Sequence, residues 1–130
     1  MTIEERAARA AKWKAAGLCN CCQAVALALA DQSSLPEEAL MAACSGFAVG
    51  MGNMEGTCGS LVGAVMTAGM HLGGKAALRY ARQISENFST RSGAVVCRDL
   101  KGLTTGQELC SCENCVRNAV LAYGEVMGLE

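Results

Sequence analysis

The number and placement of the cysteines constrain this chain more than any other feature of its sequence. Nine cysteines occur among 130 residues. The odd count, and an N-terminus that is charged where a secretory signal needs an apolar segment, argue against an exported fold held by disulfides. In a reducing cytoplasm, so many thiols indicate metal binding or redox chemistry. We therefore expect a cytoplasmic protein whose cysteines carry its function.

The composition favours closely packed helices. Apolar residues make up 52% of the chain, yet the aromatic residues are only one Trp, two Tyr and two Phe. The bulk of the core must therefore come from Ala, Leu, Val and Met, which suits helix packing better than a β-sandwich. The length fits one domain with one core. We predict an all-α fold, a single compact bundle of about five or six helices that spans residues 1–130.

Apolar periodicity and capping residues predict where the helices lie. The helix over 58–72 has few polar side chains and should be the central, most buried one, with Thr57 as its N-cap. Residues 46–56 contain four glycines and form a Gly-rich loop that leads into it. Residues 92–109 should be irregular, with one turn near Cys97. The remaining helices are expected over residues 3–16, 20–30, 34–44, 75–90 and 112–127.

Charge and hydropathy argue against two classes of partner. The formal net charge is −1, and no basic patch is present to attract nucleic acid or a membrane surface. The longest nearly uncharged stretch, residues 56–74, is interrupted by glycines and polar residues, so a buried helix explains it better than a membrane span. We expect neither nucleic acid nor membrane as a partner. The apolar central helix in so small a bundle leaves room for a homodimer.

Eight of the nine cysteines fall into four groups, three of which stand at predicted helix N-termini. A helix N-terminus favours the thiolate, which is both the nucleophile and the metal ligand. Cys112 and Cys115 form a Cys-x-x-Cys pair, which suits a metal ion, an iron–sulfur cluster or a reversible disulfide. Cys44, outside the groups, is interpreted as a core residue. The groups are Cys19, Cys21 and Cys22; Cys58; Cys97; and Cys110, Cys112 and Cys115.

Elimination narrows the choice of cofactor. The only histidine, His71, lies in the middle of a predicted helix, and no Cys-x-x-Cys-His motif for covalent haem is present. Asp-rich loops that would bind Ca²⁺ or Mg²⁺ are also missing from the sequence. Sulfur ligands leave an iron–sulfur cluster, zinc and Cu(I) as candidates, beside redox thiols that need no cofactor.

Five motifs, in order along nearly the whole chain, resemble the C_GCAxxG_C_C family, whose members are labelled redox-active. By this resemblance, the four family cysteines correspond to Cys21, Cys58, Cys97 and Cys115. Ser60 stands where the family motif has Ala, and the other five cysteines are additional. The motifs are Asn20-Cys21-Cys22-Gln23-Ala24-Val25, residues 46–52, Cys58-Gly59-Ser60-Leu61-Val62-Gly63-Ala64, Cys97-Arg98-Asp99-Leu100-Lys101-Gly102 and Cys115-Val116.

The leading hypothesis is a small redox or electron-transfer protein that holds an iron–sulfur cluster and exchanges electrons with an unidentified partner protein. Glycines near the thiols would let backbone N–H groups approach the sulfurs. The four ligands implied by the resemblance are Cys21, Cys58, Cys97 and Cys115; the added ligands would be Cys19, Cys22, Cys110 and Cys112; and the glycines are Gly50, Gly52, Gly56 and Gly59.

Two alternatives stay open. The first is an enzyme, a thiol–disulfide oxidoreductase that uses Cys112 with Cys115 or Cys21 with Cys58. No thioredoxin-like βαβ pattern accompanies these pairs. The second is a zinc- or copper-binding thiolate module, which elemental analysis would identify directly.

Overall fold

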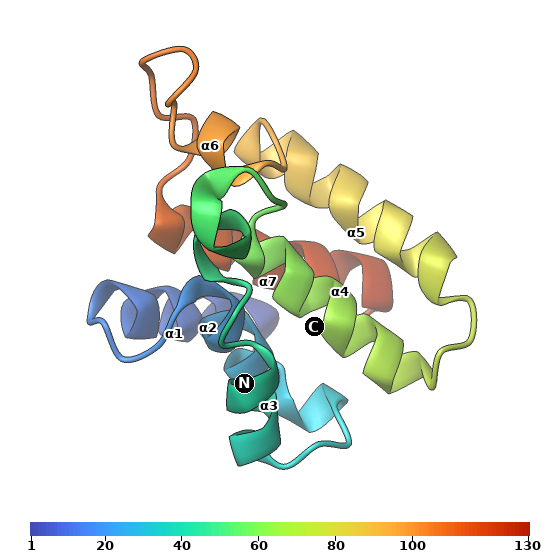
Figure 1. Cartoon of the computed structure of the whole chain (residues 1–130). Helices are drawn as coiled ribbons and strands as arrows, with labels where there is room; N and C mark the ends of the chain where they lie inside the picture. Colours follow the sequence, from blue (N-terminus) through green and yellow to red (C-terminus); the bar gives the residue numbers. More distant parts are fainter.

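The computed structural model describes residues 1–130 and is all-helical (Figure 1). The only β-type pairing is an isolated bridge between Thr57 and Val96. The all-α prediction is confirmed, with more helices than the five or six expected, because short helical turns form between the long ones. The α-helices are α1 (Ile3–Ala15), α2 (Cys21–Ala28), α3 (Glu37–Ala43), α4 (Gly59–Leu72), α5 (Ala77–Ser92), α6 (Cys97–Leu100) and α7 (Cys112–Met127), with the turns η1 (Ala30–Gln32) and η2 (Gly50–Met54).

Side-chain caps fix the starts of the long helices. Thr2 and Asn20 each form a capping box, at α1 and α2, and Ser111 accepts a hydrogen bond from the Asn114 amide at the start of α7. The predicted cap of α4 was wrong. Cys58 occupies the N-cap position, because the preceding Thr57 is drawn into the bridge with Val96.

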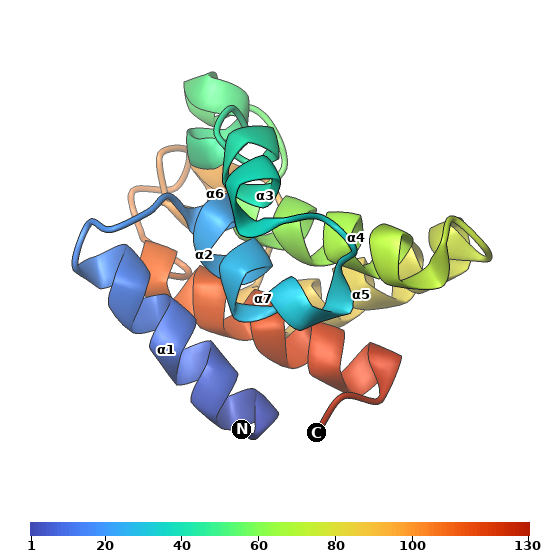
Figure 2. The same cartoon turned by 90° about the horizontal axis from the view of Figure 1, so that it is seen from below.

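Helix α7 is the hub of the bundle and packs against α1, α2, α4 and α5 (Figure 2). Its buried face includes Val116, Val120 and Tyr123. The predicted central helix, α4, packs against α2, α5 and α7, but Val65 in its middle is only half-buried. The central position is therefore shared between α4 and α7. None of the helices combines the length and hydrophobicity that a membrane span requires.

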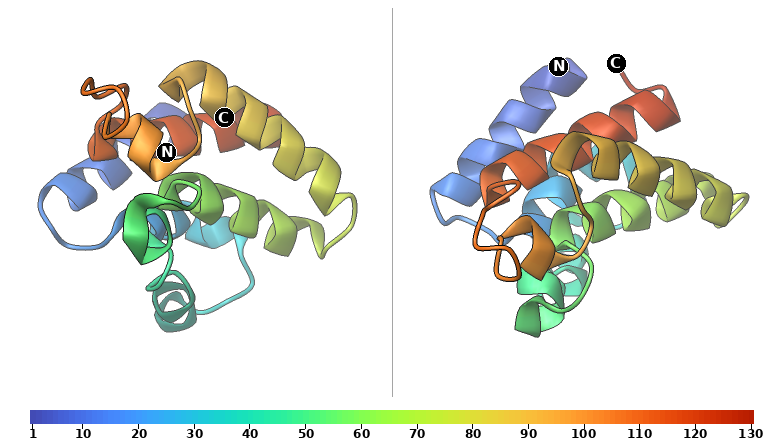
Figure 3. Two further views of the ribbon diagram at one scale, coloured as in Figure 1. Left: turned by 45° about the horizontal axis from the view of Figure 1, so that its top comes forward. Right: turned by 90° about the horizontal axis from the view of Figure 1, so that it is seen from above.

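The starts of four helices meet at one end of the bundle. There, α2, α6 and α7 begin, and α4 enters the core behind η2 (Figure 3). Each of these four helices has a cysteine at its first residue or its N-cap. The main apolar core begins at this end, since it includes Cys21, Cys58, Cys110 and Cys115. The fold thus gathers distant cysteine groups without a continuous metal-binding loop.

Candidate functional site

A cavity of about 280 Å³ lies where these helix starts meet. It is larger than an engineered apolar cavity of about 150 Å³ that binds benzene, so it has room for a ligand of several atoms. Its lining contains five cysteines and two lysines but no carboxylate. The polar and sulfur-containing lining residues are Lys14, Asn20, Cys21, Met54, Cys58, Ser60, Cys97, Lys101, Cys112 and Cys115.

Helix starts position four of the five thiols. Cys21, Cys97 and Cys112 are the first residues of α2, α6 and α7, and Cys58 is the N-cap of α4. Cys115 follows Cys112 by one turn, so the two lie on the same side of α7. The first turn of a helix has free N–H groups and the positive end of the helix dipole, which favour negative charge on sulfur. Cysteines were expected at helix N-termini in three of the four groups, and the structure adds Cys97, the first residue of α6, as the fourth.

A short antiparallel pairing brings Cys58 and Cys97 to the same wall of the cavity. The Cys58 amide donates to the Val95 carbonyl at 2.8 Å, and the Cys97 amide donates to the Gly56 carbonyl at 3.0 Å. Between them lies the Thr57–Val96 bridge. Two residues that are 39 positions apart in the chain are thus held in register by backbone hydrogen bonds.

Two of the four predicted glycines line the cavity, where the space permits no side chain. A Cβ on Gly59 would lie 2.7 Å from the Cys21 sulfur, and a Cβ on Gly50 would lie 2.5 Å from the Cβ of Cys97. Both glycines therefore let the backbone approach a cavity cysteine closely. Gly52 and Gly56 belong to the same loop but lie outside the lining.

Residues 48–54 form one wall of the cavity, here called the wall segment, and its backbone is strained. Val49, Met51 and Met54 have φ angles of 54°, 64° and 66°, in the left-handed region that side chains disfavour. For a β-branched residue such as Val49 this conformation is exceptional, and strain of this kind is concentrated at functional sites. Val49 and Cys21 both line the cavity, and the Val49 backbone lowers the pKa of Cys21, against the larger effect of burial. The strained conformation thus lies next to a cavity thiol.

Cys58 and Cys115 form a thiolate–thiol pair. The hydrogen bond that Cys58 accepts from Cys115 lowers the pKa of Cys58 to about 6, against the opposing effect of burial, and Ser60 and backbone amides contribute to the lowering. The pKa of Cys115 is raised correspondingly by its interaction with Cys58 and by burial, and its thiol also donates to the Cys110 carbonyl at 3.8 Å. Burial also raises the pKa of Cys21 and of Cys97.

Lys101 supplies positive charge to the site. Burial would lower the pKa of its ammonium, but a hydrogen bond to Cys112 and the charges of Cys115, Cys112 and Cys58 together raise it. The ammonium also donates to the Cys110 carbonyl at 3.3 Å. With Lys14 on the α1 side, it offsets negative charge on the thiols.

Ser60 carries a buried hydroxyl that faces the cavity without a well-formed hydrogen bond. Its side chain is fully buried, and no protein atom meets its Oγ with hydrogen-bond geometry, although it lies close enough to the Cys58 sulfur to lower its pKa. An unsatisfied buried hydroxyl costs about 1–3 kcal/mol. A ligand in the cavity that offers an acceptor would remove this cost.

The predicted cysteine ligands separate into two sets. Cys21, Cys58, Cys97, Cys112 and Cys115 line the cavity. The other three do not: Cys110 lies behind Cys115 and accepts a hydrogen bond from Asn118, Cys19 is half-buried beside the cavity, and Cys22 packs against Cys44 in a separate cluster.

Sequence analysis missed Lys14, Ser60 and Lys101 as lining residues. Lys101 lies one turn after Cys97, and this spacing could have indicated that the two side chains lie on the same face of a helical turn. Lys14 comes from α1, which has no cysteine, and nothing local to it indicated a site.

The donor set fits a thiolate-bound centre. No three Cys, His, Asp or Glu side chains converge as a site for one metal ion. The five cavity thiols instead surround a common space, with positive charge and N–H donors around it. Soft thiolates suit iron–sulfur clusters, zinc and Cu(I), and a cluster presents its metal atoms at several points of a cavity.

Comparison with known proteins gives one match. A family model described as "Putative redox-active protein (C_GCAxxG_C_C)" matches residues 19–126. No curated protein and no solved structure matches the chain. The matched range contains every cysteine that lines the cavity.

Proposed function

This chain belongs to the C_GCAxxG_C_C family of redox-active proteins, and we propose that it transfers electrons through an iron–sulfur cluster bound in the cysteine cavity. The ligands in this proposal are the thiolates of Cys21, Cys58, Cys97 and Cys115. The observation that carries it is the convergence of thiols from four helix starts on one ligand-sized cavity. The unpartnered hydroxyl of Ser60 supports it, because a sulfide or thiolate would accept its hydrogen bond.

The arrangement favours a cluster over a single zinc ion. A structural zinc site needs four ligands around one point, and no three candidate side chains meet that condition here. Thiols that surround a cavity suit a centre with several metal atoms. When bound, such a cluster supplies one-electron transfer at a potential that the protein sets.

The chain's own residues would tune that potential. The Val49 backbone lowers the pKa of Cys21, and the Ser60 and Leu61 backbone lowers that of Cys58. These backbone groups, the dipoles of four helix starts and the lysine ammonium groups all stabilise negative charge and so favour the reduced state. Cys112 is a fifth thiol, available as an additional ligand or as the hydrogen-bond partner of Lys101.

The test is anaerobic reconstitution with iron and sulfide, followed by metal analysis and a visible absorption spectrum. We expect the wild-type protein to retain iron and labile sulfide, and Cys58→Ser and Cys97→Ser to lose most of both. Cys19→Ser is the matched control, because Cys19 is half-buried beside the cavity but does not line it. Wild-type protein that retains no iron, or cavity variants that retain as much as Cys19→Ser, would contradict the proposal.

A thiol–disulfide oxidoreductase is the second candidate, and the Cys58–Cys115 pair favours it. A thiolate that accepts a hydrogen bond from a neighbouring thiol is the arrangement of a reactive dithiol. This pair differs from the predicted Cys112–Cys115 and Cys21–Cys58 pairs. Thiol titration separates the candidates: reversible loss of two thiols in iron-free protein that does not take up iron would support the oxidoreductase.

A further inference from the structure

Cys22 and Cys44 lie outside the cavity and pack against each other. Both are fully buried, in a small cluster with Ala26 and Leu40. Cys21 and Cys22 are consecutive at the start of α2, so their side chains point about 100° apart. Cys21 therefore faces the cavity while Cys22 faces α3.

Cys22 and Cys44 are packed in the same buried cluster, and the surrounding structure holds them there. The two thiols are near enough to influence each other, so that the pKa of Cys22 is raised and that of Cys44 is lowered. Next to them, the Gln23 side chain donates to the Met41 carbonyl at 3.0 Å, and the Asn20 side chain donates to the Cys44 carbonyl at 3.4 Å. The end of α3 is thus fastened to the start of α2 beside the pair.

We propose that Cys22 and Cys44 form a second redox site, separate from the cavity, which closes reversibly to a disulfide. The oxidant is a low-molecular-weight disulfide. One protein sulfur attacks it, releases the first small thiol and forms a mixed disulfide; the second protein sulfur then displaces the other small thiol. The two protein thiols together give up two electrons and two protons, which leave with the two small thiols.

Helix α3 gives this buried pair access to the oxidant. The helix has seven residues, and Leu40 is the only one of them that is buried. So short and exposed a helix opens locally at low cost. Cys44 is its C-cap and moves with it, so Cys44 is the sulfur that meets the oxidant first.

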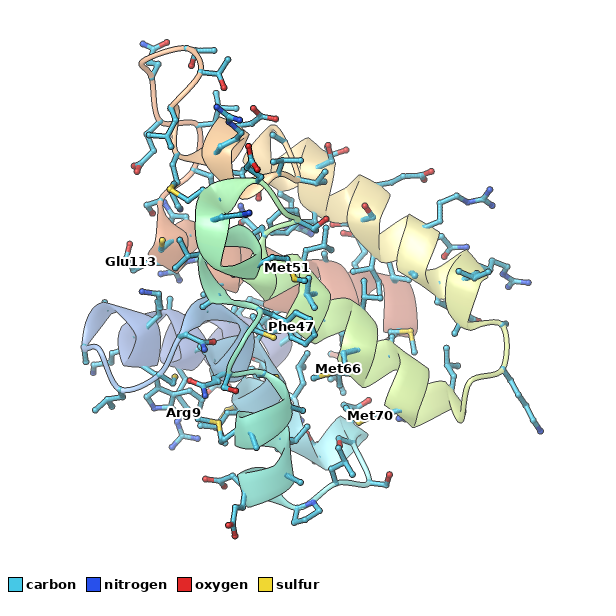
Figure 4. The ribbon with its side chains drawn as sticks, viewed as in Figure 1. Arg9, Phe47, Met51, Met66, Met70 and Glu113 are labelled. Atoms are coloured by element: carbon cyan, nitrogen blue, oxygen red, sulfur yellow. The ribbon has the colours of Figure 1, made fainter.

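The disulfide would act on the cavity through the chain that follows α3. The wall segment begins four residues after Cys44, and α2 carries Cys21 into the cavity. Phe47, Met66 and Met70 pack against the cluster of the pair and lie between α3 and α4 (Figure 4). Oxidation would fix α3 against α2 and so restrict the start of the wall segment.

The test uses the full-length protein, purified anaerobically, and equilibrated in glutathione buffers of increasing oxidation. A protease that cleaves after glutamate places Cys44 and its possible partners on different peptides. Cys44 is the only cysteine of residues 39–55; residues 6–37 contain Cys19, Cys21 and Cys22; and residues 56–86 contain only Cys58. We expect mass spectrometry to find the 39–55 peptide linked to the 6–37 peptide. Dithiothreitol should reverse the link, and oxidation should raise the Tm by roughly 5 °C or more.

Two variants identify the partner of Cys44. Cys22→Ala should abolish the link, whereas Cys19→Ala should retain it. A 39–55 peptide that stays unlinked in wild-type protein at every buffer composition, or that carries only glutathione, would overturn the proposal. So would a link that persists in Cys22→Ala. Iron content is measured on the same samples, so that this outcome is scored independently of cluster binding.

Discussion

At the scale of single residues, the Ser60 hydroxyl influences the charge state of the nearby Cys58 thiol. Its hydroxyl is buried, lacks a well-formed partner and lies beside the Cys58 sulfur. A hydroxyl that donates to a thiolate stabilises the charged form and, in a cluster, the reduced form. Sequence analysis treated this residue only as a small substitute for Ala, because its burial and its distance from a thiol appear only in three dimensions.

We predict that Ser60→Ala lowers the reduction potential of the reconstituted protein, because a hydrogen bond that favours the reduced state is lost. Redox titration followed by visible absorption measures the change. Thr67→Val is the control, since Thr67 is a buried residue of the same helix whose hydroxyl donates to the Gly63 carbonyl, outside the cavity. An unchanged potential in Ser60→Ala would show that the hydroxyl does not contact the redox centre.

The pH dependence of Cys58 alkylation is a second prediction at this scale. In reduced, metal-free protein the Cys58 pKa is lowered to about 6, so the thiolate and its reactivity should persist down to that pH and be lost below it. An ordinary cysteine loses reactivity below about pH 8.5. In Cys115→Ala the hydrogen bond is gone, and the midpoint should move to higher pH. Alkylation rates from pH 5 to 9 test this; equal midpoints in the two proteins would contradict the thiolate–thiol pair.

Helix α4 is the element on which the cavity depends, and its glycines have different roles. A Cβ on Gly59 would lie 2.7 Å from the Cys21 sulfur and 2.6 Å from the Phe47 carbonyl, whereas a Cβ on Gly69 would meet nothing within 4 Å. We predict that Gly59→Ala destabilises the fold by about 1–3 kcal/mol through overpacking. Gly69→Ala should be neutral or stabilising by about 0.5–1 kcal/mol. Chemical denaturation measures both, and similar effects at the two positions would refute the close approach at Gly59.

The elements themselves follow well from the sequence. Apolar periodicity predicted α7 at both ends and α1 to within one residue, because these helices are amphipathic. The cap of α4 and the strained wall segment could not be predicted in this way. The cap of α4 depends on the pairing of Thr57 with Val96, and the wall segment packs against α6, where Gly50 lies close to Cys97. Both are contacts between segments that are distant in sequence.

At the scale of the whole molecule, the bundle gathers five thiols where α2, α4, α6 and α7 begin, and three of them, Cys21, Cys58 and Cys115, also belong to the main apolar core. Local patterns predicted thiols at helix starts, and the family resemblance ranked Cys21, Cys58, Cys97 and Cys115 above the rest. That these four share one cavity with Cys112, while Cys22 turns away from it, depends on how α2, α4, α6 and α7 pack. No local pattern encodes that packing.

The ion pair between Arg6 and Asp31 fastens α1 to η1 and gives a prediction for the whole fold. Arg6, which is 15% exposed, lowers the pKa of the Asp31 carboxyl by hydrogen bonding. A lowered pKa stabilises the fold above the carboxyl's unfolded value, and this contribution is lost as pH falls through the folded value. The Tm of wild-type protein should therefore fall more steeply below about pH 4 than that of Asp31→Asn. Parallel melting curves would contradict this role.

The amount of iron and acid-labile sulfide in anaerobically purified protein tests the central claim most directly. The cavity of thiols predicts a coloured protein in which iron and labile sulfide occur together, in an amount per chain that Cys19→Ser preserves and Cys58→Ser loses. Colourless protein that contains neither iron nor sulfide, before and after reconstitution, would contradict a cluster in this cavity.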